Sequence, residues 1–232
     1  MISDEVRIIY VRPGRTPSAF PTRPPRPARD MDESPFSVIL ADLIGRIRGA
    51  YAAALVDRDG EAVDYAGNLP PFDIRVAAAT WRIMLTHVVA MRSIIGTASS
   101  MSIRAKRQTA VMHALPDGYA LVVLLRPRIG LATTTRAFSA CAYALATEAS
   151  WPLTSEIAPW FPLTVDVDRR DRPIRIVYGG LAEPVEVLGI LSNKHTRLTR
   201  GERGYRIRLA SGPEITVVRE TTGYWYAEER FG

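Results

Sequence analysis

The most regular hydrophobic pattern in the chain lies between Phe72 and Ile95. Its apolar residues recur every three or four positions, and no Gly or Pro interrupts the run. This spacing predicts a helix, which would be about 36 Å long at 1.5 Å per residue. Apolar residues occupy several sides of this helix, so a single sheet face would not cover them all. We therefore expect one side of the helix to pack on a sheet and another side to contact a second copy of the chain.

The residues before this helix predict a shorter helix and a hairpin. The short helix begins at Ser34-Pro35, because serine caps helices well and proline suits the first helical turn. Two apolar runs, 51–56 and 62–66, flank the turn residues Asp57-Arg58-Asp59-Gly60. Such a turn between two apolar runs is typical of a β-hairpin.

The residues after the long helix repeat this arrangement. Two strand-like runs, 101–115 and 118–126, are joined by Pro116-Asp117-Gly118, and a last helix covers roughly residues 134–149. The resulting order of helices and hairpins predicts an α+β fold, in which helices cover an antiparallel or mixed sheet.

The C-terminal part of the chain has a different pattern. Pro152 and Pro159 interrupt the stretch from Trp151 to Trp160, where we place a domain boundary. Six short strand-like runs follow, separated by turn residues, at 163–168, 173–179, 184–191, 205–211, 214–220 and 224–231. This spacing predicts a small antiparallel sheet or barrel.

The N-terminal part predicts little packed structure. Residues 5–11 are strand-like, and the stretch from Arg12 to Arg29 holds six prolines and five arginines without an acidic residue. Proline at this density prevents regular helix and sheet, so we expect an extended basic linker; a polyproline ligand is the alternative. The predicted organisation is therefore an N-terminal strand and linker at 1–33, an α+β domain at 34–152 and a β domain at 160–232.

Charge and composition narrow the class of protein. The formal net charge is +6, and 28 of the 30 basic residues are arginine. The basic residues are spread along the chain, which is not typical of a dedicated nucleic-acid binder. Charged residues within 72–95 argue against a membrane span, and the first residues do not resemble a signal peptide, so we expect a cytoplasmic protein.

No arrangement of residues indicates an enzyme, a metal site or a cofactor. His87, His113 and His195 lie far apart, and the single cysteine, Cys141, lies in an apolar helical run where it is expected to be buried. The acidic residues Asp57, Asp59, Glu61 and Asp64 lack the spacing of a calcium loop, and turn chemistry explains Asp57 and Asp59. Neither phosphate-binding glycine motif occurs, and no serine-hydrolase elbow is present.

The first hairpin, AYAAALVDRDGEAVDYAGN, resembles that of the roadblock (dynein light-chain) family. The long helix, the hairpin AVMHALPDGYALVVLL and the closing helix are similar to that family as well, over about residues 36–150. The resemblance implies a longin-like sheet, with the first and last helices on one face and the long helix on the other. The C-terminal pattern PIRIVYGG, RGYRIRLASG and TGYWYAEERF resembles a small bacterial β domain of unassigned function.

Roadblock proteins typically form dimers through the long helix and the third strand, and they bind or regulate small Ras-like GTPases or serve as assembly platforms. The resemblance therefore implies a homodimeric, non-enzymatic regulator or scaffold. The residues expected at its dimer interface are Val76, Ala79, Ile83, Met84, His87, Met91, Ile103 and Ala105. The residues expected to face a small GTPase are Arg82, Arg104, Lys106 and Arg107.

Two alternatives remain open at this point. The C-terminal β domain interleaves arginine with tyrosine and tryptophan, a combination that binds and stacks nucleic-acid bases. Its candidate anion-binding residues are Arg197, Arg200, Arg203 and Arg206. Acidic residues in the same region nearly cancel the charge, which weakens this alternative. The third hypothesis is a purely structural dimer or filament-positioning scaffold.

Overall fold

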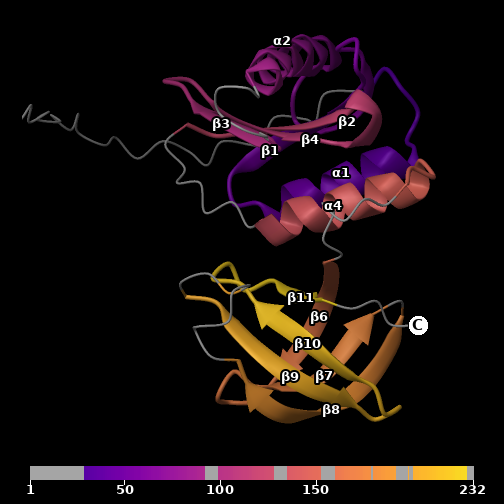
Figure 1. The fold of residues 1–232 in the computed structure, drawn as a ribbon, viewed down its shortest axis with the longest axis vertical. Coiled ribbons are helices and arrows are strands. Elements are labelled where there is room, and N and C mark those ends of the chain that lie inside the picture. The colour runs from indigo at the N-terminus through magenta and orange to yellow at the C-terminus, as the bar shows by residue number, and fades with distance from the viewer. Residues whose placement is uncertain are drawn as a thin grey trace, which may run out of the picture.

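The computed structural model describes residues 29–91, 99–127, 135–152, 160–178, 180–191, 198 and 201–228. The predicted strand at 5–11, most of the Arg/Pro linker and the predicted boundary around 153–159 lie outside these residues. The described chain forms a five-stranded sheet with helices on both faces and a closed six-stranded barrel (Figure 1). Both parts of the predicted α+β architecture are thus confirmed.

The elements of the first part follow the predicted order, with one addition. They are α1 (Pro35–Arg46), β1 (Ala50–Val56), β2 (Ala62–Gly67), α2 (Pro71–Ala90), β3 (Ser100–Arg104), β4 (Thr109–Ala114), the short 3₁₀ helix η1 (Pro116–Gly118), β5 (Ala120–Leu125) and α4 (Thr135–Glu148). The single strand predicted at 101–115 is wrong, because this run folds back on itself as the hairpin β3–β4. The polar residues between Arg104 and Thr109 form its turn, in which the Ala105 amide donates to the Gln108 carbonyl (2.9 Å).

Local side-chain chemistry fixes the start of α1 and the first hairpin turn. The Ser34 hydroxyl accepts hydrogen bonds from the backbone amides of Phe36 and Ser37, and the Ser37 hydroxyl accepts one from the Ser34 amide. This capping box satisfies amides that the first helical turn leaves without partners. In the turn between β1 and β2, the Asp57 carboxylate accepts from the amides of Asp59 and Glu61, each at 2.9 Å. Turn chemistry accounts for these acidic residues, as predicted.

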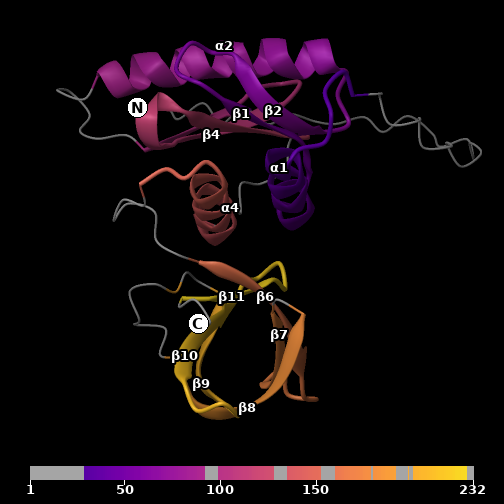
Figure 2. The ribbon, with the colours of Figure 1, turned by 90° about the vertical axis from the view of Figure 1, so that its right-hand side faces the viewer.

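The sheet has the strand order β2-β1-β5-β4-β3, and all four pairings are antiparallel. Figure 2 shows α2 along one face and α1 and α4 against the other. Ile74, Ala78 and Leu85 of α2 are buried against the first face. Cys141 is buried with Phe138 of α4 against the opposite face, and burial raises the pKa of its thiol. The layering implied by the roadblock resemblance is therefore present.

The barrel contains β6 (Phe161–Val167), β7 (Pro173–Tyr178), β8 (Leu181–Ile190), β9 (Arg203–Leu209), β10 (Glu214–Arg219) and β11 (Trp225–Ala227). Its strands close in the order β10-β11-β6-β7-β8-β9, so the barrel has no free edge. Trp160, Val218 and Tyr226 belong to the same buried cluster as residues of α1 and α4. The barrel therefore packs on the helical layer, and the Tyr224 hydroxyl donates to the Gly45 carbonyl across this contact (2.7 Å).

The half-buried side chain of His113 makes stability depend on pH. His113 lies on β4 near the ring of Phe138, with 6.2 Å between ring centroids, and burial lowers its pKa from the usual value of 6.5. The unfolded chain consequently binds this proton more readily than the folded chain. We expect the free energy of unfolding to fall as pH drops below about 6.5, by at most about 1.4 kcal/mol per pH unit.

Urea unfolding at pH values between 5.5 and 7.5 measures this dependence. Replacing His113→Gln removes the titrating group and should flatten the curve over that range. An unchanged slope in the variant would assign the pH dependence to other groups.

Candidate protein-interaction surface

The side of α2 that faces away from the sheet carries exposed apolar residues. Phe72, Val76 and Ile83 are 74%, 48% and 56% exposed, respectively. They are four and seven positions apart, which places them on one side of the helix. We call these three residues the outer stripe. They lie roughly opposite the buried residues Ile74, Ala78 and Leu85, on the side of α2 that faces away from the sheet.

The structure places most of the predicted interface residues on or beside this stripe. Val76 and Ile83 belong to it. Met84 and His87 are exposed farther along the same helix, and Met91 is exposed directly after its end. Ala79 is half-buried and lies close to Gly60 in the first hairpin turn. A Cβ added at position 60 would lie 3.9 Å from the Ala79 Cα. Ala79 therefore borders the stripe and also contacts its own domain.

The strand next to this helix also has an unpaired side. β3 is the last strand in the sheet order, and among the described residues it pairs only with β4. Met101 and Ile103 pack toward the α2 layer and are partly buried there. Ala105 lies in the β3–β4 turn, so its expected place on the third strand is wrong. The open edge and the outer stripe together form the candidate dimerisation surface.

The four residues expected to face a GTPase separate into two groups. Arg82 makes internal hydrogen bonds: its guanidinium donates to the Asp57 carbonyl (3.2 Å), to the Gly118 carbonyl (2.7 Å) and to the Thr86 hydroxyl. It thereby ties α2 to two hairpin turns. Arg104, Lys106 and Arg107 are exposed at the β3–β4 turn, where they face solvent.

The barrel has less unpaired positive charge available to bind nucleic acid than its composition indicates. Arg197 and Arg200 lie outside the described residues. Arg203 and Arg206 each have an acidic neighbour, Asp171 at 3.4 Å and Glu214 at 3.6 Å. The hydrogen bond from Arg208 lowers the pKa of the Glu214 carboxyl. Acidic side chains therefore already neutralise much of this surface.

The aromatic residues of the barrel are also unsuited to stacking bases. Tyr205, Trp225 and Tyr226 are buried, and the first two pack in the barrel core. Tyr224 is exposed, yet its hydroxyl is bound to the helical layer. Base stacking requires an accessible ring face. The structure thus leaves this alternative with few accessible rings among the described aromatic residues of the barrel.

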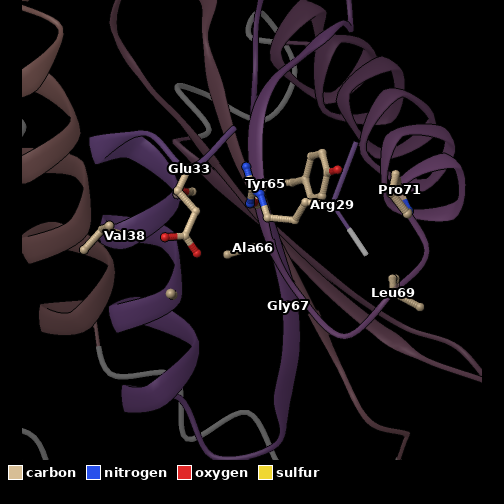
Figure 3. Close-up of a pocket in the computed structure, with 10 residues that line it drawn as sticks. Arg29, Glu33, Val38, Tyr65, Ala66, Gly67, Leu69 and Pro71 are labelled. Atoms are coloured by element: carbon tan, nitrogen blue, oxygen red, sulfur yellow. The ribbon is translucent and has the colours of Figure 1, made fainter. Parts of the chain in front are cut away.

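A cavity of about 250 Å³ lies between α1, the edge strand β2 and the start of α2. Figure 3 shows Arg29 lying against Tyr65 at this edge, with Glu33 nearby. The Arg29 guanidinium is paired with the buried Asp64 carboxylate (2.7 Å) and stacks over the Tyr65 ring (4.7 Å). Asp64 also accepts from the Ser34 hydroxyl and from the Tyr65 amide.

Sequence reasoning missed this polar cluster, because Arg29 and Asp64 are 35 residues apart and no motif joins them. The carboxylate is already satisfied by internal donors, so the cluster attaches the first described residues to β2. We assign it a structural role.

The described residues contain neither a candidate metal site nor a candidate membrane-spanning helix. No group of three or more His, Cys, Asp or Glu side chains is placed to hold a metal ion within those residues. No helix among them is long and apolar enough to cross a membrane. His195 lies outside the described residues.

Comparison with known proteins finds similarity only at the level of structure. No protein-family profile matches the chain, and no curated protein sequence matches it significantly. A Roadblock/LC7 domain from Streptomyces avermitilis is 14% identical, covering 49% of this chain and 97% of that one, with a TM-score of 0.45. Myxococcus xanthus MglB is 16% identical over 50% of this chain and 94% of its own, with a TM-score of 0.44. The gliding protein MglB from Thermus thermophilus is 18% identical over 54% and 98%, with a TM-score of 0.41.

Proposed function

We propose that this protein is a dimeric, non-catalytic regulator or scaffold that binds a small Ras-like GTPase through its roadblock-like domain. The observation that carries the proposal is the outer stripe, in which three large apolar side chains of one helix face solvent. Exposed apolar surface of this kind is typical of protein–protein interfaces. A second feature of the same domain is the open edge of β3, where a second copy can extend the sheet.

The proposed dimer uses both features at once. A twofold axis perpendicular to the sheet beside β3 would bring two copies of β3 together, edge to edge. It would also set both copies of α2 on the same face of the joined sheet, where their exposed apolar residues can meet. Such an isologous contact buries the same patch on both copies. It also removes a free sheet edge, which is otherwise prone to aggregation.

The proposed effect on the GTPase is positional. GTP hydrolysis needs groups that orient water and stabilise charge on the transferred phosphate. The sequence has no phosphate-binding loop, and Arg82, the predicted partner-facing arginine on the long helix, is engaged internally. We therefore expect this protein to act by positioning the partner's own groups or by tethering the partner.

Affinity capture tests the proposal directly. The immobilised full chain is exposed to lysate of the source cell in the presence of GDP or of a non-hydrolysable GTP analogue, and bound proteins are identified by mass spectrometry. We expect a small GTPase that is enriched in one nucleotide state. Capture that is independent of the nucleotide, or the absence of any GTPase, would contradict the proposal.

A matched pair of variants shows whether capture requires the dimer. Val76→Glu alters the outer stripe, whereas Val38→Glu makes the same change at an exposed site on α1 that lies on the other face of the sheet. We expect the first variant to lose the GTPase and the second to retain it.

A further inference from the structure

One end of the five-stranded sheet carries an uninterrupted group of positive charges. Arg48 lies just before β1, Arg126 immediately follows β5, and Arg104, Lys106 and Arg107 lie at the β3–β4 turn. All five side chains are exposed. We call them the basic row.

The sheet topology brings these residues together although they are distant in sequence. The strand order β1-β5-β4-β3 makes the ends of four adjacent strands neighbours. The Arg126 amide donates to the Gly49 carbonyl (2.9 Å), which places Arg126 beside Arg48. The Tyr51 hydroxyl donates to the Gln108 side-chain oxygen (3.2 Å), which ties the β3–β4 turn to β1. At about 4.8 Å per strand, the row spans roughly 15 Å.

The charges of the row are not neutralised within the described chain. No ion pair to any of its five side chains is present among those residues, and the segments 47–51, 103–110 and 124–127 contain no acidic residue. The arginines on the outer surface of the barrel differ in this respect, because several of them pair with aspartate or glutamate. Five exposed basic residues from distant parts of the sequence are therefore gathered at this sheet end.

We propose that the basic row binds the phosphate backbone of duplex nucleic acid. Guanidinium groups present planar forks of donors that match phosphate oxygens. The core of a protein interface is usually apolar and aromatic, whereas Ala105, Gln108 and Pro127 are the uncharged exposed or half-buried neighbours here. The large exposed apolar side chains lie elsewhere, so the row also lacks an anchor for insertion into a membrane. Single-stranded nucleic acid fits less well, because no exposed ring lies among these segments for stacking.

Fluorescence anisotropy with a labelled mixed-sequence DNA duplex tests this inference on the full chain. If all five side chains contact phosphates, the slope of log K against log salt concentration should be about −4.5. The double variant Arg104→Gln/Lys106→Gln should reduce that slope by about 1.8 and weaken binding about 60-fold at 0.1 M salt.

A charge-matched variant separates the row from the barrel. Arg203→Gln/Arg206→Gln removes the same charge from the barrel and should leave both slope and affinity nearly unchanged. An equal loss in the two variants, or no binding of duplex at 50 mM salt, would overturn the inference. Vesicles containing phosphatidylglycerol provide a second probe: row-dependent binding to vesicles without binding to DNA would identify a membrane surface instead and also overturn it. The failure of this test would leave the GTPase capture result unaffected.

Discussion

The double variant Val76→Glu/Ile83→Glu should be a folded monomer. Both side chains are largely exposed in the single chain, so their replacement removes little packing from the fold. Both copies in the proposed dimer carry both substitutions, so four new carboxylates would have to be buried in the interface without partners. Isolated charges in an apolar interface are strongly unfavourable. We expect dimerisation to weaken by at least about 30-fold, corresponding to the loss of a typical interface hot spot of 2 kcal/mol or more.

Sedimentation equilibrium over a range of protein concentrations measures this change. The melting temperature and the circular dichroism spectrum of the monomer serve as the measure of folding. Val38→Glu is the control for introducing a carboxylate, because it replaces a valine of α1 that is 62% exposed and lies on the other face of the sheet (Figure 2). A double variant that remains dimeric would show that the outer stripe is not the interface. Ile83 tests the interface more specifically than Ala79 does. Ala79 lies against the first hairpin turn, so a charge there would also disturb folding.

The elements that sequence predicted well are those specified by neighbouring residues. The helix α2 follows from a 3.6-residue period. The helix α1 begins directly after Ser34, whose hydroxyl caps amides no more than three positions away. The turn at Asp57–Gly60 follows from residues that bond to their own backbone. In each case the signal and the structure occupy the same short stretch of chain.

The features that the sequence did not predict either have no local signal or depend on residues that are distant in the chain. The β3–β4 turn contains Ala105, Lys106, Arg107 and Gln108, which include no Gly, Pro, Asn or Asp to mark it. The basic row arises only when the strand order places Arg48 beside Arg126. The neutralised charge on the barrel depends on cross-strand register, which also brings Arg208 within 3.3 Å of Glu186, 22 residues away. Such pairings cannot be obtained from local patterns.

The same limit applies to the contact between the barrel and the helical layer. The sequence predicts a boundary near residues 153–159 and two independently soluble parts. The structure places Arg136 of α4 and Glu202, next to β9, in an ion pair whose side chains are only 4% and 5% exposed. The Arg136 guanidinium also lies 4.4 Å from the centre of the Trp160 ring. The two parts therefore share a buried polar contact, and we expect them to unfold together.

Replacing Glu202→Ala should destabilise the whole chain, because it leaves the Arg136 charge buried without this partner. Breaking a buried ion pair in this way typically costs about 3–5 kcal/mol. For a chain of this length we expect the melting temperature to fall by roughly 6–15 °C in one cooperative transition. Differential scanning calorimetry measures both the shift and the number of transitions. The double variant Arg136→Met/Glu202→Leu should recover most of the loss, since apolar side chains of similar size need no charged partner.

The exposed ion pair between Arg175 and Asp166 supplies the control for this experiment. Both of its side chains are largely exposed, so Asp166→Ala should change the free energy of unfolding by no more than about 1 kcal/mol. If Glu202→Ala has an equally small effect, or if only one of two separate transitions moves, the barrel and the helical layer fold independently. A single transition that shifts as a whole would instead mean that the barrel stabilises the helices beneath the sheet. Binding at the outer stripe would then depend on an intact barrel, although the two lie on opposite sides of the sheet.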